Sequence, residues 1–262
     1  MLIVISPAKS LDYGSPAKTR RFTEPEFLRD SQQLVNLLKK LTPGDFSELM
    51  HISAKLGELN HGRYLNWHTP FDLKNAKQAI FAFKGDVYIG LEAEQFTTAD
   101  LNFAQKHLRI LSGLYGLLRP LDLMQPYRLE MGSSFAYKQG INERGKSLYA
   151  FWDSKLTRNL NALQASEKNP ILINLASKEY FSAIKPNELD ADVITPVFKD
   201  FSGGQYRVLS FFAKKARGAM SAYIIKNRIA RPEKLKDFAG DGYRYSAADS
   251  TDSRFVFLRK QH

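Results

Sequence analysis

Apolar and polar positions divide this chain into segments with the spacing of strands and segments with the spacing of helices. Leu2 to Ile5 forms an unbroken apolar run, which is typical of a buried strand. The polar segment from Ser6 to Asp12 follows it, and we expect a loop at the carboxyl end of that strand. Further strands are predicted over residues 79–83, 171–175, 192–198, 206–212, 243–245 and 255–258.

Capping signals and helical spacing predict the helices. Thr42 is suited to cap a helix over residues 43–56. Pro43 fits its first position, and Asp45 meets the positive end of the helix dipole. Other helices are expected over residues 26–41, 148–165 and 213–229, with a short helix after Pro232. The order is mixed and not a regular βαβ alternation, and the chain has no linker or repeat, so we predict an α+β fold in a single domain, residues 1–262.

Composition excludes several classes of site. The sequence contains no cysteine, which excludes disulfides, cysteine-ligated metals and thiol nucleophiles. The N-terminal apolar run lacks a basic region before it and a cleavage site after it, so we interpret it as a strand and not as a signal peptide. No window approaches the roughly 20 apolar residues of a spanning helix. We expect a cytoplasmic protein without membrane association.

The charge distribution favours a polyanionic partner. The formal net charge is +11, and residues 206–236 hold nine basic side chains against one acid, Glu233. The predicted basic helix carries Lys214, Lys215 and Arg217 in its first turns, where the helix dipole disfavours cations by about 0.3–1 kcal/mol each. We interpret this as an anion site suited to phosphate. The alternative is a solvated face of exposed cations.

A second candidate segment runs over residues 106–120. Thr97 and Asp100 are spaced as a cap pair, and apolar positions at helical intervals predict a helix from there to Gly113. A tight turn then passes Gly116, and such turns bring backbone N–H groups close to phosphate. This pattern is similar to a helix-hairpin-helix, although that motif has its glycines two apart and these are three apart. The alternative is an apolar corner in the core.

The first loop holds Lys9 between two serines, Ser6 and Ser10, where it could bind an anion or act as a nucleophile if buried. The sequence has no P-loop, no dinucleotide-binding glycine motif and no nucleophile elbow. Its five histidines show no i, i+3 or i, i+4 pairing, so we expect no cofactor and no protein-ligated metal. Purified protein should therefore hold no stoichiometric iron or zinc.

Several segments together closely resemble the YaaA family of bacterial peroxide-stress proteins. They are residues 5–12, 83–88, 111–132, 174–181 and 214–218, and the resemblance extends over essentially the whole chain. It implies a cytoplasmic protein, produced under hydrogen peroxide stress, that binds double-stranded or structured DNA and is associated with lower free intracellular iron. It also implies a single curved α/β body with a positively charged cleft and a helix-hairpin-helix. No catalytic activity and no obligate protein partner come with it.

Carried over by position, the resemblance places the helix-hairpin-helix over residues 106–119. The expected DNA-binding residues are Lys9, Lys106, Arg109, Gly113, Gly116, Arg119, Arg128, Lys214, Lys215 and Arg217. We expect the first loop, residues 119–130 and the basic helix to meet at one concave positive surface.

Two functional classes stay open, and a third is disfavoured. The first is a DNA binder with little sequence specificity, whose affinity falls steeply with salt. The second is an enzyme acting on a phosphorylated or nucleic-acid substrate in the same cleft, through Lys9, Tyr127, Arg128, Glu130 and Lys215. There Glu130 would be a general acid or base, or would only orient Arg128. An iron-sequestering protein is disfavoured because paired histidine and carboxylate ligands are scarce.

Overall fold

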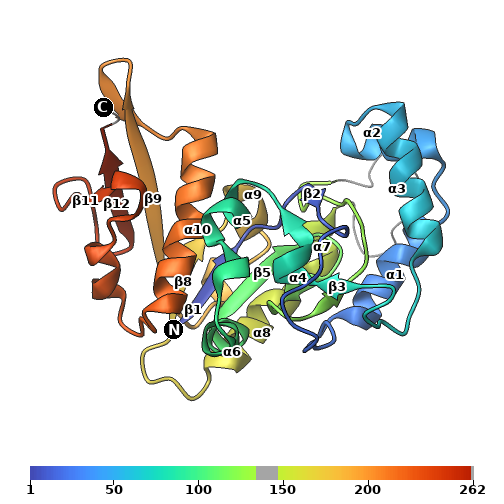
Figure 1. Ribbon diagram of the computed structural model, residues 1–262, viewed down its shortest axis with the longest axis horizontal. Coiled ribbons are helices and arrows are strands. Elements are labelled where there is room, and N and C mark those ends of the chain that lie inside the picture. Colours follow the sequence, from blue (N-terminus) through green and yellow to red (C-terminus); the bar gives the residue numbers. More distant parts are fainter. Residues whose placement is uncertain (134–146, 261–262) are drawn as a thin grey trace.

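An eight-stranded mixed sheet runs through the middle of the molecule (Figure 1). The structure, a computed structural model, describes residues 1–133 and 147–260. The sheet order is β11-β12-β9-β8-β1-β5-β6, and β10 pairs with β9 outside this path. Its strands are β1 (Leu2–Ile5), β5 (Leu108–Ser112), β6 (Gly116–Leu118), β8 (Ile171–Leu175), β9 (Asp192–Ser202), β10 (Gln205–Arg207), β11 (Arg244–Tyr245) and β12 (Arg254–Arg259). Two small antiparallel sheets pair β2 (Ser10–Leu11) with β4 (Phe83–Lys84) and β3 (Lys77–Gln78) with β7 (Leu123–Met124).

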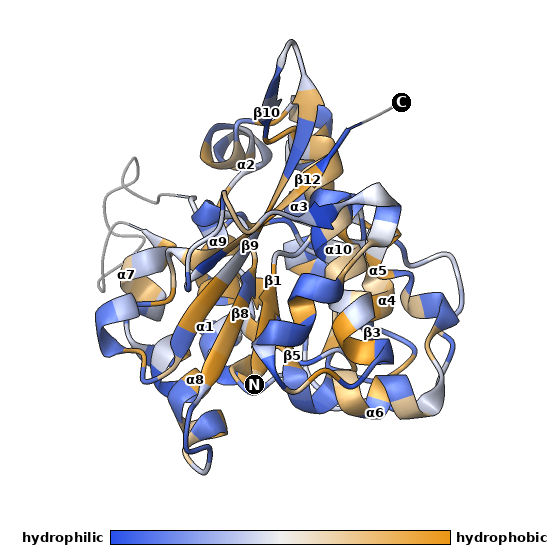
Figure 2. Ribbon diagram, turned by 90° about the vertical axis from the view of Figure 1, so that its left-hand side faces the viewer, coloured by the Kyte–Doolittle hydropathy of each residue, from blue (hydrophilic) through white to orange (hydrophobic). Residues whose placement is uncertain are grey.

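The centre of the sheet is parallel, which corrects the predicted α+β class. Neighbouring strands run parallel from β12 through β9, β8 and β1 to β5, whereas β6, β10 and β11 are antiparallel additions. The architecture is thus a mixed α/β domain. The order of elements in the sequence did not indicate this class, because the connection from β1 to β5 contains six α-helices, a 3-10 helix and the short strands β2, β3 and β4 instead of one crossover helix. The central strands are coloured mainly as hydrophobic in Figure 2.

The direction of the connections reverses at β1. From β1 the chain crosses to β5 on one side, and it later returns to β8 on the other side. In open α/β sheets, ligands bind outside the carboxyl ends of the strands at such a reversal. The topology therefore indicates a candidate ligand site at the loops that follow β1 and β8.

Helices cover the sheet and extend the molecule on one side (Figure 1). The α-helices are α1 (Leu28–Leu38), α2 (Pro43–Met50), α3 (Ala54–Asn66), α4 (Ala79–Ala82), α5 (Asp86–Leu91), α6 (Thr98–His107), α7 (Leu148–Trp152), α8 (Lys155–Gln164), α9 (Lys178–Phe181) and α10 (Ser210–Lys226). Short 3-10 helices are η1 (Ala93–Gln95), η2 (Pro186–Glu188), η3 (Pro232–Asp237) and η4 (Gly240–Gly242). Within the described ranges, none of the helices has the length and apolar character needed to cross a membrane.

The predicted helix over residues 43–56 is two helices in the structure. His51 adopts a left-handed conformation, with φ of 50°, that ends α2. After Ser53 the chain enters α3, and the rings of Phe46 and Tyr64 stack between the two helices with centroids 5.2 Å apart. The sequence did not signal α3 because its buried positions are glycine, asparagine and tyrosine and not an aliphatic series. We call α2, α3 and their connection the α2–α3 hairpin.

Other predictions are confirmed or corrected at the level of single elements. The N-cap predicted at Thr42 and the cap pair predicted for Thr97 and Asp100 are confirmed, and each forms a capping box. The strand predicted over 79–83 is wrong, because Ala79–Ala82 makes one buried helical turn before a two-residue strand. The helix predicted over 148–165 is interrupted at Asp153, whose φ is 42°.

The basic helix begins earlier than predicted. Ser210–Lys226 forms α10, and the strand predicted over 206–212 ends at Arg207. Lys214 consequently lies in the second turn of α10, so the predicted combination of its charge with the free N–H groups of the helix start is wrong.

A close crossing of two helices holds α10 in place. A Cβ atom on Gly218 of α10 would lie 1.8 Å from the main-chain oxygen of Val87 in α5. A Cβ atom on Gly90 of α5 would lie 2.0 Å from the main-chain oxygen of Lys215 in α10. Only glycine permits this approach, and it brings α10 next to the loops at the carboxyl end of the sheet.

Candidate functional site

Two adjoining cavities open beside the carboxyl ends of β1 and β8, and together we call them the cleft. The first, of about 470 Å³, is bounded by the loops after β1 and β8, the start of α5 and one face of α10. The second, of about 730 Å³, lies between the end of α2 and residues 128–133. Lys9, Glu130 and Glu179 line both cavities and join them. The cleft thus extends from the α2–α3 hairpin to α10.

Two serines link the loop after β1 to the loop after β8, and these loops form the floor of the cleft. The main-chain N–H of Ser177, after β8, donates to Oγ of Ser6, after β1, over 2.8 Å. The Tyr88 hydroxyl donates to the main-chain oxygen of Ser6 over 3.2 Å. Because these bonds link β1, β8 and α5, the floor is a rigid part of the sheet edge and not a free loop.

One wall of the cleft is built on Glu130. Its Oε1 accepts from Nε of Arg128 over 3.0 Å and lies 3.4 Å from Nζ of Lys9. Its Oε2 is buried and has no hydrogen-bond partner among the residues that the structure describes. Lys9 itself is largely exposed, with 68% of its side chain accessible. The ion pair with Arg128, one of the two alternatives for Glu130, is present, and the other carboxylate oxygen is directed to no protein group within residues 1–133 and 147–260.

The opposite wall is formed by α10, which contributes Lys214 and Arg217 to the smaller cavity. The guanidinium group of Arg217 is half-buried and makes no hydrogen bond or ion pair with any residue in the described ranges. Burial lowers the pKa of this guanidinium below its ordinary value, and no neighbouring carboxylate opposes the shift. A partly desolvated cation without an anionic partner is costly for folding alone.

Lys215 lies outside this arrangement, although it is the next residue to Lys214. Its Nζ lies 3.3 Å from Oδ2 of Asp241, and it lines neither cavity. The predicted meeting of three distant segments therefore holds for the first loop, for Arg128 and Glu130, and for α10 through Lys214 and Arg217.

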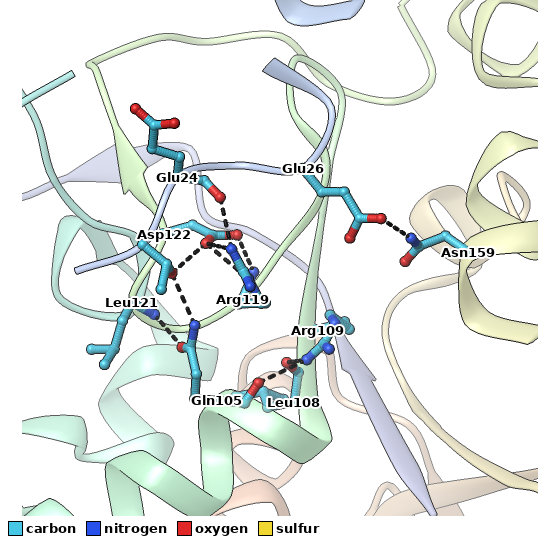
Figure 3. A network of polar contacts seen from close by, with 10 residues as sticks. Glu24, Glu26, Gln105, Leu108, Arg109, Arg119, Leu121, Asp122 and Asn159 are labelled. Carbon is cyan, nitrogen blue, oxygen red and sulfur yellow. Dashed lines mark hydrogen bonds and ion pairs between the residues drawn. The ribbon is translucent and has the colours of Figure 1, made fainter. Parts of the chain in front are cut away.

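Two other predicted cations are structural (Figure 3). Nε and a terminal nitrogen of Arg119 bind Oδ1 of the buried Asp122 over 3.0 and 2.9 Å, and the main-chain oxygen of Glu24 accepts from the same guanidinium. Arg109 is buried and donates to the main-chain oxygens of Gln105 and Leu108. Burial lowers the pKa of Arg109 to about 10, which leaves it charged at neutral pH. Neither arginine lines the cleft.

The helix-hairpin-helix predicted over residues 106–119 is not formed there. Strand β5 follows α6 directly, and β6 pairs back on it, so the segment is a β-hairpin. Gly113 packs against the main chain of Leu129, and Gly116, with φ of 68°, packs against Trp152. Both glycines are buried, whereas Lys106 is exposed on α6 away from the cleft. The alternative reading, an apolar corner in the core, describes these glycines.

The cleft, which was expected to be positively charged, holds both cations and acids. Its smaller cavity is lined by four cations, Lys9, Lys84, Lys214 and Arg217, and by three acids, Asp86, Glu130 and Glu179. Glu130 compensates Lys9, and Asp12 lies 3.9 Å from Lys84. The uncompensated positive charge is therefore concentrated on the wall formed by α10.

Several cleft residues were not singled out from the sequence. Lys84, Glu179 and Tyr180 line the smaller cavity, and all three lie within segments that carry the family resemblance. Their position at the ends of strands was the available signal, but it becomes visible only once the strand order is known. In the described part of the chain, no group of three or more His, Asp or Glu side chains is placed to hold a metal ion.

The fold and the cleft define a mixed α/β protein with a candidate ligand site at the carboxyl edge of its parallel strands. Comparison with known families identifies the family: residues 1–249 match the family described as peroxide stress protein YaaA, and the chain belongs to that family. Similar proteins include a UPF0246 protein of Teredinibacter turnerae, 57% identical over 261 residues that cover 100% of both chains. UPF0246 proteins of Cellvibrio japonicus and Saccharophagus degradans are each 56% identical over 261 residues, covering 100% of this chain and 99% and 100% of theirs.

Proposed function

We propose that this protein binds DNA in the cytoplasm during peroxide stress, largely without sequence specificity, and that this activity accompanies the lowering of free iron that limits oxidative DNA damage. The observation that carries the proposal is the unpartnered guanidinium of Arg217, which faces the same cavity as Lys214 and Lys9. Phosphate supplies the missing anion, because a guanidinium binds it through charge-assisted hydrogen bonds. A DNA backbone offers such groups in series whatever its sequence.

The α2–α3 hairpin supports the same proposal from the other end of the cleft. Its connection includes His51, which lines the larger cavity, and α3 starts directly afterwards at Ala54. The helix-hairpin-helix that the resemblance implies would then be this element and not residues 106–119. A duplex lying along the cleft would have its backbone between this hairpin and α10.

The proposal is tested by three alanine variants of α10. Arg217→Ala and Lys214→Ala should each weaken binding of a labelled duplex by about tenfold or more, because a hydrogen bond to a charged group contributes about 1.5–3 kcal/mol. Lys215→Ala is the matched control, since it removes the same charge from the same helix at a residue bound to Asp241. The measurement is fluorescence anisotropy on duplexes of unrelated sequence. Equal loss in all three variants would show that net charge alone, and not the cleft, determines affinity.

A second candidate function is an enzyme acting on a phosphorylated or nucleic-acid substrate in the cleft. It is favoured by the position of the cleft at the reversal of strand order and by the buried Oε2 of Glu130, which has no hydrogen-bond partner in the described part of the chain. Tyr127 is a weaker candidate, because it is buried with its hydroxyl 2.6 Å from Oγ of Ser112 and burial raises its pKa. Glu130→Gln should abolish turnover of such a substrate and leave DNA affinity intact. In a protein that only binds, the same change leaves affinity equal or slightly tighter, because it removes a negative charge near phosphate.

A further inference from the structure

Two exposed aromatic rings lie side by side on a projecting β-hairpin. Strands β9 and β10 are joined by Gly203 and Gly204, whose φ angles of 61° and 82° form a tight turn that suits glycine. Phe201 and Tyr206 are paired across the hairpin with ring centroids 5.2 Å apart. Their side chains are 39% and 40% exposed, and the hairpin extends beyond the rest of the sheet in both views (Figure 1, Figure 2). Packing in the buried core therefore does not explain why these two positions of the hairpin are aromatic.

Cations surround these rings. Nζ of Lys260 lies 5.7 Å from the centroid of Phe201. Lys199 precedes Phe201 by two positions on the same strand and so shares its face. The hairpin also holds an acid, Asp200, but this side chain is fully buried and bound to Arg259. The exposed surface of the hairpin is therefore aromatic and positively charged.

A third exposed aromatic ring lies on α10, beside the cleft. Phe211, in the first turn of α10, is 56% exposed. Lys214 follows it by three positions, so the two side chains are neighbours on one face of the helix. Because Lys214 lines the smaller cavity, Phe211 lies beside the cleft on α10, and the chain runs from the hairpin directly into this helix. We call the paired rings of Phe201 and Tyr206 the aromatic platform.

We propose that the aromatic platform binds unpaired nucleotides, so that the protein prefers single-stranded or locally unpaired DNA to a fully paired duplex. This inference rests on the proposed DNA binding and names the DNA structure that is preferred. Unpaired bases stack on exposed rings in proteins that bind single strands, while cations along the same surface hold the phosphates. A protein partner or a second copy of the chain fits less well, because the cores of protein interfaces are depleted of lysine.

The test uses the full chain with Phe201→Ala and Tyr206→Ala combined, and Leu163→Ala as control. Leu163 is a comparably exposed apolar residue, 41% accessible, on α8. Affinities are measured by fluorescence anisotropy for a labelled oligothymidine and for a duplex of equal length at the same salt. The double variant should lose about tenfold or more in affinity for the single strand and little for the duplex, and the control should change neither.

A second readout follows base stacking directly. An oligonucleotide containing 2-aminopurine should lose fluorescence when it binds the wild-type chain and keep more of it when it binds the double variant. Equal losses of affinity for both DNAs, or none, would overturn the platform while leaving DNA binding by the cleft in place. A wild-type dimer in analytical ultracentrifugation that the double variant dissociates would overturn it in favour of a protein interface. If the wild-type chain binds neither DNA, the platform and the proposed function both fail.

Discussion

Replacing Gly218 with alanine tests the helix crossing that places α10 against the cleft. The new Cβ atom would lie 1.8 Å from the main-chain oxygen of Val87, whereas real Cβ atoms essentially never approach a neighbour within 3.0 Å. That oxygen belongs to the backbone of α5 and cannot turn away, so the two helices must separate. Overpacking of this kind costs about 1–3 kcal/mol or more, against a gain of about 1 kcal/mol from the helix propensity of alanine. Because the approach of 1.8 Å is far inside the limit, we take the upper end of this cost and expect Gly218→Ala to lower the free energy of unfolding by about 2 kcal/mol.

Gly62→Ala is the matched control, because Gly62 also lies inside a helix, α3, but a Cβ atom there meets nothing within 4 Å. This variant should gain about 0.5–1 kcal/mol from helix propensity alone. Urea denaturation followed by circular dichroism measures both changes, and for a chain of this size 1 kcal/mol corresponds to a shift in Tm of about 2–4 °C. The reasoning is refuted if Gly218→Ala is as stable as the wild-type chain, or if both variants shift in the same direction.

Two further predictions concern stability. Asp200→Ala should lower the free energy of unfolding by about 3–5 kcal/mol, because it leaves the guanidinium of Arg259 without its buried partner. Lys234→Ala breaks only an exposed ion pair and should lower it by less than about 1 kcal/mol in the same urea titration. Burial lowers the pKa of His107 below its usual range, so the unfolded chain binds this proton more readily and stability should fall as pH drops from about 7 toward 5. Thermal melts of wild type and His107→Gln across that range should converge at low pH, and parallel curves would contradict this assignment.

The sequence was sufficient where a local rule determines the structure. The caps at Thr42 and Thr97 were predicted correctly, because a helix cap depends on residues only three positions apart. The strand β8 was predicted with its observed bounds from an isolated apolar run. Predictions of secondary structure failed where a segment is buried on all sides, because such a segment lacks the alternation of apolar and polar residues that distinguishes a strand from a helix. Strand β5 is buried at every position, so its apolar residues fit a helical spacing as well as a strand.

The candidate site was only partly predictable. Charged residues can be counted along a sequence, but the sequence does not show in which direction each side chain points. Lys214 and Lys215 are adjacent and chemically equal, yet on a helix successive side chains point about 100° apart, and only one of them lines the cleft. Arg109 and Arg119 looked like phosphate ligands. Arg109 is instead buried and donates to the nearby main-chain oxygens of Gln105 and Leu108, and Arg119 donates to the main-chain oxygen of Glu24, which is distant in the sequence. Such pairing depends on the tertiary fold.

The salt dependence of DNA binding tests the central claim most directly. Anisotropy of a labelled duplex should be titrated from low to physiological salt with the wild-type chain, Arg217→Ala and Lys215→Ala. If the cleft binds phosphates, log K for the wild-type chain should fall steeply and linearly with log [salt], and Arg217→Ala should flatten the slope by about 0.9. Lys215→Ala should keep the wild-type slope. A flat salt response of the wild-type chain would contradict DNA binding, and an unchanged slope for Arg217→Ala would contradict the assignment of that binding to the cleft.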